Sequence, residues 1–293
     1  MLDLSIGIMA YNEEANIGHL LESVMNQEFA HGRLKEIFVV ASGCSDGTED
    51  VVRGFERKDK RIKLLVQKDR EGKASAINLF LSKATGNILI LESGDTIPEP
   101  GTLDRLTAPF SDERVGMTGA HPAPVNSAET FIGFSVNLMW TLHHKIALET
   151  PKLGELVAFR EVVKQIPRDT AVDEASIEAI IRKAGYELRY VPQAIVRNKG
   201  PENIKDLLKQ RRRIAAGHKH LMREEGYEVS TMDPKNILKI LLRQHSWRVK
   251  DTLWTIGAIG LEMLGRVLGY YDFYVKKRNP FIWDMASSTK KLN

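Results

Sequence analysis

LSIGIMAYNEE, at residues 4–14, is a short apolar run that ends in a polar cluster. The same pattern recurs in EIFVVASGCSDGT at residues 36–48 and in NILILESGDTIP at residues 87–98. Each run predicts a buried strand, and residues 62–66 predict another. Between the strands, apolar residues recur with helical spacing over residues 16–27, 48–57 and 73–85. Strands that alternate with helices predict an α/β fold with a mostly parallel sheet flanked by helices.

The polar clusters at residues 11–14, 42–48 and 92–95 each follow one of the predicted strands. In open parallel sheets, ligands bind in a crevice at the carboxyl ends of the strands. We therefore expect the three clusters to converge on one crevice and to form the binding site.

The composition is that of an ordinary globular protein. Of the 293 residues, 43% are apolar and 27% are charged, which excludes a disordered or fibrous chain. The single cysteine, Cys44, excludes an internal disulfide and a multi-cysteine zinc site, and it favours a reducing, cytoplasmic compartment. The charge is uneven, since residues 1–198 have a net charge of −5 and residues 199–293 one of +9. Such a basic C-terminal part predicts an anionic partner, with a merely solvated tail as the alternative.

The second half of the chain predicts mainly helices. They cover residues 131–148, 173–184, 204–221 and, as one or two amphipathic helices, 235–275, with a short strand at residues 188–191. Residues 253–271 are the most apolar stretch, but they include Glu262 and Arg266, each of which would cost roughly 2.5–3.5 kcal/mol at a bilayer centre. We therefore expect a helix that lies at a membrane surface or packs on the protein. Aromatic residues favour the membrane surface, because basic residues stand between them; these are Trp247, Trp254, Tyr270, Tyr271 and Trp283.

Four short motifs, taken together, resemble those of family 2 glycosyltransferases. They are Ala10-Tyr11-Asn12-Glu13-Glu14, Ser45-Asp46-Gly47-Thr48, Gly72-Lys73-Ala74 and Gln210-Arg211-Arg212-Arg213, and they occur in the family's order. The resemblance implies a GT-A fold that transfers a sugar from a nucleotide donor with inversion. It also implies a catalytic domain over residues 1–222, which leaves residues 223–293 as a basic, amphipathic, membrane-associated helical extension.

The family's D-x-D motif resembles the segment around Asp95. Asp95 stands at the second aspartate, whereas Ser93 stands at the first. The resemblance implies that Asp95 holds Mg²⁺ or Mn²⁺, alone or together with Glu92, since these ions bind one or two carboxylates plus phosphate oxygens. The alternative is an aspartate that only caps a turn.

The same resemblance implies the donor pocket. Ser42 and the preceding alanine stand where the family often has two aspartates, and Asp46 either contacts the nucleotide or caps the next helix. Gln210 and Arg213 would bind the diphosphate, because a guanidinium binds phosphate oxygens in pairs; a solvated basic helix is the alternative. Ile214 replaces the tryptophan of processive members. The predicted donor-binding residues are Tyr11, Asn12, Glu13, Ser42, Asp46, Lys73, Ser93, Gln210 and Arg213.

Asp173 and Glu174 resemble the acidic pair with which the family serves the acceptor, in reversed order. A carboxylate there would take the proton of the attacking hydroxyl. If the acceptor is a lipid phosphate, the pair would only position groups. Acids that favour a helix N-terminus through its dipole are the alternative. Residues 154–160, GELVAFR, resemble the segment on the acceptor side, with a plain strand and turn as the alternative.

These features predict an inverting hexosyltransferase. It would move a hexose from a nucleotide-diphosphate sugar to a lipid-linked or growing glycan, at the cytoplasmic face of the cell membrane and in peripheral contact with it. A non-catalytic scaffold that binds sugar nucleotides or membranes is the alternative. A nucleotidyltransferase would have a glycine-rich loop where this chain has AYNEE, and no nucleic-acid reading motif is present.

Overall fold

The computed structural model describes residues 1–228, 248–282 and 287–290. Trp247, Trp283 and the part of the predicted helices at residues 235–247 lie outside the described residues.

The first hundred residues form the predicted alternation of parallel strands and helices. The strands are β1 (Leu2–Ala10), β2 (Gly32–Ser42), β3 (Ile62–Gln67) and β4 (Ile88–Ser93). The helices between them are α1 (Ile17–Met25), α2 (Thr48–Lys58) and α3 (Lys73–Lys83). All pairs among these strands are parallel, in the order β3-β2-β1-β4. The prediction for this half, and with it the α/β class, is confirmed.

The second half continues the same sheet in mixed directions. Its strands are β5 (Thr96–Pro98), β6 (Val115–Pro124), β7 (Val157–Arg160) and β8 (Glu187–Asn198). Among the described residues the sheet has the order β3-β2-β1-β4-β7-β6-β8-β5. Strand β7 runs antiparallel to both β4 and β6, whereas β6 and β8 are parallel. The turn before β7 therefore lies at the same sheet edge as the carboxyl end of β4.

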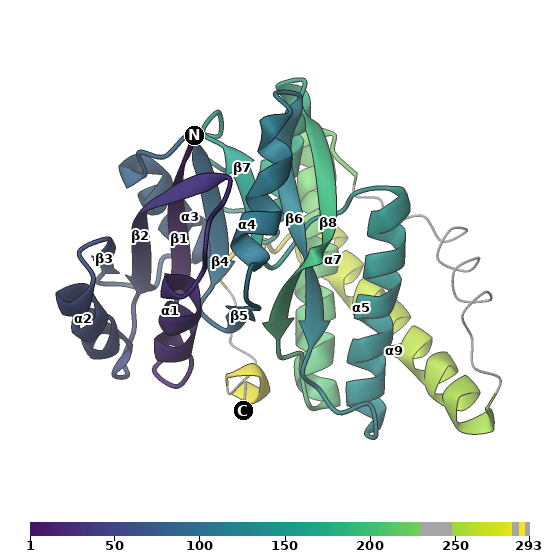
Figure 1. Cartoon of the computed structure of the whole chain (residues 1–293). Coiled ribbons are helices and arrows are strands. Elements are labelled where there is room, and N and C mark those ends of the chain that lie inside the picture. The colour runs from purple at the N-terminus through teal and green to yellow at the C-terminus, as the bar shows by residue number, and fades with distance from the viewer. Residues whose placement is uncertain (229–247, 283–286, 291–293) are drawn as a thin grey trace.

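Helices cover both faces of the sheet, as Figure 1 shows. The remaining ones are α4 (Thr102–Thr107), α5 (Phe131–Glu149), α6 (Asp173–Lys183), α7 (Ile204–Glu225) and α9 (Val249–Tyr274), with short 3₁₀ turns η1 (Ala108–Ser111) and η3 (Ser287–Thr289). Alternate side chains of β1 and β2 enter two separate apolar clusters, one against α1 and one against α3. Phe80 of α3 packs directly over Gly7, where a Cβ atom would lie 2.5 Å from its ring. This close packing fixes α3, and so Lys73, against β1.

The C-terminal helical extension is present, and α9 packs along α7. Arg211 pairs with Glu262 through Nε and Oε2 at 2.5 Å, and Arg212 pairs with Asp272. The predicted boundary at residue 222 falls within α7, and it stays a prediction. None of the helices in the described residues combines the length and the apolar character that crossing a bilayer requires.

Candidate functional site

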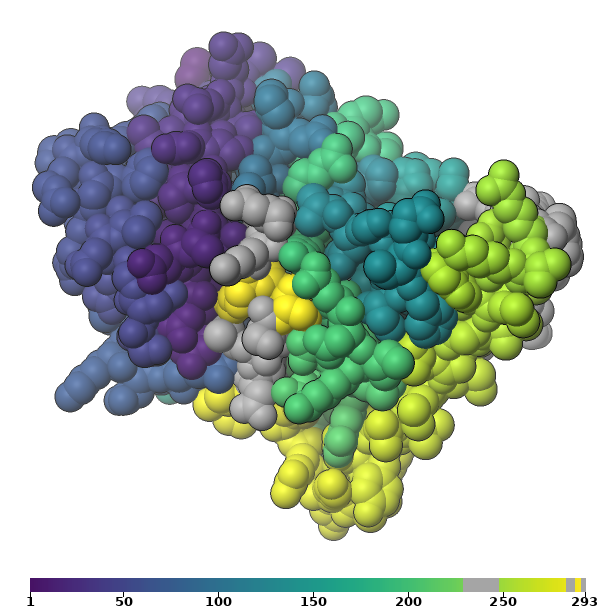
Figure 2. Space-filling view, turned by 90° about the horizontal axis from the view of Figure 1, so that it is seen from below, coloured from purple at the N-terminus to yellow at the C-terminus, as the bar shows by residue number. Residues whose placement is uncertain are grey.

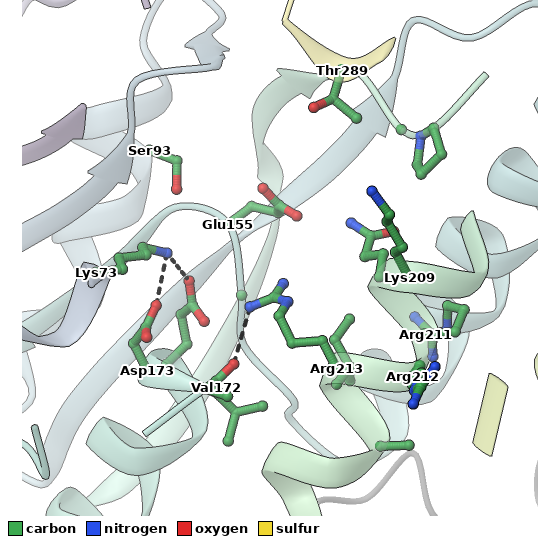
Figure 3. A pocket seen from close by; sticks show the side chains of 18 of the residues that line it. Lys73, Ser93, Glu155, Val172, Asp173, Lys209, Arg211, Arg212, Arg213 and Thr289 are labelled. Carbon is green, nitrogen blue, oxygen red and sulfur yellow. Dashed lines mark hydrogen bonds and ion pairs between the residues drawn. The ribbon is translucent and has the colours of Figure 1, made fainter. Parts of the chain in front are cut away.

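One cavity of about 1280 Å³ opens at the carboxyl ends of β1, β2 and β4 and extends between α5, α7 and α9. It brings together most of the predicted site residues, some of which Figure 3 shows. The predicted residues that line it are Tyr11, Glu13, Ser42, Lys73, Ser93, Asp95, Asp173, Glu174, Gln210 and Arg213. The convergence expected from the strand ends is therefore observed.

Asn12 and Asp46 do not line the cavity; they tie its loops together. Asn12 has a left-handed backbone with φ of 53°, and its side-chain oxygen accepts a 2.8 Å hydrogen bond from the Ser45 backbone N–H. Asp46 accepts hydrogen bonds from the hydroxyl and the N–H of Thr48, at 2.5 and 3.1 Å. Burial acts to raise the Asp46 pKa, but these hydrogen bonds outweigh it and lower the pKa. The capping alternative thus describes what Asp46 does here.

Glu92 also stays out of the cavity. Its side chain is fully buried below the sheet edge and accepts a 3.1 Å hydrogen bond from the Thr96 hydroxyl. Burial raises its pKa to about 8, so it is mostly protonated at neutral pH. Asp95, three residues further along the chain, lines the cavity, whereas Glu92 does not. The geometry favours Asp95 alone over the Asp95–Glu92 pair as the metal-holding group of this loop.

Lys73, the first residue of α3, joins the two acids of α6. Its Nζ lies 2.9 Å from Asp173 Oδ2 and 3.0 Å from Glu174 Oε1 (Figure 3). Burial alone would lower the Lys73 pKa, but both carboxylate charges outweigh burial and raise it. Burial likewise acts to raise the Glu174 pKa, and the Lys73 charge and hydrogen bond outweigh it and lower the pKa. Glu174 is therefore held as a carboxylate, whereas burial raises the pKa of Asp173.

Glu155 is a cavity residue that belongs to the segment 154–160, which resembles the acceptor side, but it was not predicted as a site residue itself. It lies in the turn before β7 with a left-handed φ of 62°, which is uncommon for a residue with a side chain. In Figure 3 its carboxylate points into the space between Lys73 and Lys209. Burial, and then the charge of Asp95, raise its pKa to about 7. Only the glycine before it and the apolar run after it mark this turn in the sequence, and neither pattern reveals a positive φ.

The region around Asp95 suits a cation and a polar ligand. Burial, and then the charge of Asp95, raise the pKa of Glu13 to about 7, so two acids face each other here. The Ser42 hydroxyl is buried without a hydrogen-bond partner among the described residues, and it lines the same cavity. No group of three acidic, histidine or cysteine residues that could hold a metal occurs within the described ranges. A divalent ion would thus need donor oxygens besides Asp95, as Mg²⁺ commonly does when it binds between a carboxylate and a diphosphate.

Helix α7 divides the predicted Gln210–Arg213 motif between two faces. Gln210 and Arg213 are three residues apart, so they share one face, and both line the cavity. Arg213 donates a 3.1 Å hydrogen bond from Nη1 to the Ala171 carbonyl just before α6. Arg211 and Arg212 also reach the cavity wall, but acids of α9 hold them. Arg213 therefore lies near the acids of α6, whereas Arg211 and Arg212 bind α9.

Comparison with known sequences agrees with the motifs. The sequence model described as "Glycosyl transferase family 2" matches residues 5–161. The probable glycosyltransferase YdaM of Bacillus subtilis (strain 168) is 26% identical over 235 residues, which cover 75% of this chain and 56% of that protein. Poly-beta-1,6-N-acetyl-D-glucosamine synthase of Staphylococcus epidermidis (strain RP62A) is 23% identical and is matched over 56% of its length. The chain thus spans about half the length of these curated relatives.

Solved structures share the fold over most of this chain. A mannosyltransferase of Pyrobaculum calidifontis in complex with GDP-Man and Mn²⁺ has a TM-score of 0.67 at 20% identity, covering 92% of this chain and 87% of its own. Glucosyl-3-phosphoglycerate synthase of Mycobacterium tuberculosis with Mn²⁺ and UDP-Glc has a TM-score of 0.56 at 18% identity, covering 78% of this chain and 81% of its own. At such identities the likeness establishes the fold, and the predicted sheet with its C-terminal helices is confirmed.

Proposed function

Since the chain belongs to glycosyl transferase family 2 and has the GT-A fold, we propose that it moves a hexose from a nucleotide-diphosphate sugar to an acceptor hydroxyl in one inverting displacement. One observation supports the proposal most strongly: predicted site residues from six separate sequence segments line a single cavity at the strand ends. The acceptor would be lipid-linked or a growing glycan. The relatives and neighbours named above support this class of reaction.

The donor would lie over the ends of β1, β2 and β4. Tyr11, Glu13, Ser42 and Ser93 line this part of the cavity, and the unpartnered Ser42 hydroxyl would bond the nucleoside. Asp95 would hold Mg²⁺ or Mn²⁺, as the metal-containing neighbours suggest. When bound, the ion would offset negative charge on the departing diphosphate. Gln210 and Arg213 would lie on the opposite wall.

The chemical step is a balanced displacement at the anomeric carbon. The acceptor oxygen forms a bond to the anomeric carbon while the bond between that carbon and the diphosphate oxygen breaks. The nucleoside diphosphate then leaves. Glu174 takes the acceptor proton, because Lys73 keeps it ionised and it faces the cavity. Asp173 shares Lys73 and holds it in place. Attack from the face opposite the leaving group inverts the configuration.

A panel of UDP-, GDP- and dTDP-sugars tests this function. The purified protein, with membrane extract as the acceptor source, would be assayed for nucleoside diphosphate release with Mn²⁺ and with EDTA. We expect metal-dependent release from one donor. Binding without release under any of these conditions would favour the alternative, a non-catalytic scaffold of the same fold, and absence of binding would contradict the donor site itself.

A peripheral membrane contact is the second part of the proposal, and the outer face of α9 supports it. This face is apolar and exposed: Val249, Leu253, Ile256, Met263 and Val267 have 61–76% of their surface accessible. These residues recur every three, four or seven positions, so they form one stripe. Exposed cations flank it at Arg248 and Lys250 and again at Lys276, Lys277 and Arg278. An apolar stripe between cations fits the surface of an anionic bilayer.

Replacing Ile256 and Val267 together by glutamate should weaken binding to vesicles of phosphatidylcholine and phosphatidylglycerol by at least about tenfold, because burying each side chain contributes roughly 1.5–3 kcal/mol. Co-sedimentation with the vesicles measures the binding. Lys60→Glu is the matched control, since it changes the charge equally at an exposed site remote from α9. Equal loss in the control, or no loss in the double variant, would contradict an α9 contact.

A further inference from the structure

The described residues 279–282 and 287–290 lie at the mouth of the donor side of the cavity. In Figure 2 their yellow surface is visible between the purple N-terminal part and the green helix α7. We call the described residues 279–282 and 287–290 the C-terminal strap. Phe281, Ile282, Thr289 and Lys290 of the strap line the cavity. Thr289 is drawn above Glu155 in Figure 3.

Side-chain hydrogen bonds hold the strap on both sides of the cavity. Asn279 donates to the Asp169 carbonyl at 2.7 Å, before α6. The Ser288 hydroxyl donates to Asp206 Oδ2 of α7 at 2.7 Å. On the opposite side, Asn16 donates to the Lys290 carbonyl at 2.8 Å. The strap thus joins α7 to the start of α1 across the mouth of the cavity.

Lys290 places an ammonium group at the strand ends. Its Nζ donates to the Tyr11 carbonyl at 2.8 Å and forms an ion pair with Glu13. The Glu13 side chain lies beside Gly94, where an added Cβ atom would be 2.9 Å from Glu13 Cγ, and Gly94 directly precedes Asp95. Lys290 therefore lies in the region where the metal and the diphosphate would be. An ammonium group has three N–H donors, and contacts with the described residues account for two of Lys290's.

Four of the other cations that line the cavity are bonded away from the end of β1, whereas Arg70 lies over the Tyr11 ring, 4.1 Å from its centroid. Lys73 pairs with both acids of α6, and Arg211 and Arg212 pair with acids of α9. Arg213 faces α6 through the Ala171 carbonyl. Lys290, in contrast, donates a hydrogen bond to the Tyr11 carbonyl directly after β1, where the diphosphate would lie.

On the basis of the proposed function, we propose that Lys290 is a ligand of the donor's diphosphate and that the C-terminal strap forms the third wall of the donor site. The remaining N–H of Lys290 donates to a phosphate oxygen, and Tyr11 and Glu13 hold the ammonium in position. Lys290 then adds a positive charge beside Asp95, in a loop where Ser93 has replaced one metal-binding carboxylate.

Titration calorimetry with UDP, GDP and dTDP tests the proposal, using the nucleotide that the unmodified protein binds, in Mn²⁺ and in EDTA. Lys290→Met should weaken binding roughly 10- to 100-fold in both conditions, as expected for loss of a charged hydrogen bond. Lys290→Arg should stay within about threefold of the unmodified protein. Lys60→Met, at an exposed site remote from the cavity, is the control. Ser288→Ala, which removes the hydroxyl bond to Asp206 without removing the ammonium, should weaken binding by a smaller factor.

Unchanged binding in Lys290→Met would overturn the proposal. Tighter binding would overturn it too, since Lys290 would then compete with the donor or the metal for Glu13 and Asp95. These results differ from failure of the proposed function, in which the unmodified protein binds none of the three nucleotides. Thermal unfolding without nucleotide checks that each variant is folded.

Discussion

Glu174→Gln is expected to lower kcat by roughly 10²–10⁴-fold, the range that a positioned general base contributes. Glutamine keeps the size of the side chain and can still accept a hydrogen bond from Lys73, which lies 3.0 Å from Glu174 Oε1. It cannot take the proton of the attacking hydroxyl. Nucleoside diphosphate release at saturating donor measures kcat, and calorimetry measures donor binding. Together they distinguish the loss of a general base from weaker binding of the donor.

The pH dependence separates Glu174 from Glu155, the other carboxylate that could act as a base. Lys73 outweighs burial at Glu174 and lowers its pKa, so Glu174 stays ionised and kcat should hold steady between about pH 6 and pH 8. Glu155 has a pKa of about 7 because of burial and of the Asp95 charge. A base with that pKa would make kcat fall about tenfold per pH unit below 7. Such a fall, abolished by Glu155→Gln, would assign the base to Glu155 and contradict the role of Glu174.

The cavity residues at the strand ends were predictable because local pattern and topology agree there. Tyr11, Ser42 and Asp95 each follow an apolar run that forms a parallel strand, and parallel strands end at one sheet edge. The parallel pairing of β1–β4 therefore follows from the alternation of strands and helices, whereas their order in the sheet was not predicted. Strand β6 was not predicted, because Gly116, Gly119, Pro122 and Pro124 interrupt its apolar pattern.

Residues that depend on tertiary contacts were not predictable in the same way. Lys290 meets Tyr11 across 279 positions of the chain, and no spacing rule connects them. Glu155 reaches the cavity because β7 enters the sheet antiparallel beside β4, a direction that the alternating pattern does not predict. Asn12 and Asp46 were predicted to bind the donor, but they do not line the cavity, and they form hydrogen bonds within the loops. The sequence motifs thus identified the loops at the cavity, but which of their residues face the cavity depends on side-chain geometry.

Asp95→Asn is expected to lower metal-dependent turnover by roughly 10³-fold, because charge stabilisation by a bound metal is worth several kcal/mol and each 1.36 kcal/mol is tenfold in rate. Asparagine preserves the shape of the loop and removes the carboxylate that lines the cavity. Since a serine, Ser93, stands where the family's D-x-D motif has its first aspartate, and Glu92 is fully buried, no further carboxylate of this loop can replace it. Calorimetry of Mn²⁺ binding with nucleoside diphosphate present, together with turnover, measures the effect.

Ser93→Asp, in the same loop, is the matched opposite change. It restores a second carboxylate at a residue that already lines the cavity, so Mn²⁺ should bind more tightly, because the site then offers two oxygen ligands of full charge. If Asp95 holds the metal alone, the two substitutions must move the Mn²⁺ affinity in opposite directions. Unchanged Mn²⁺ affinity in Asp95→Asn would place the ion elsewhere. Glu13 and Glu155, which both lie within reach of the Asp95 charge, would then be the carboxylates to substitute next.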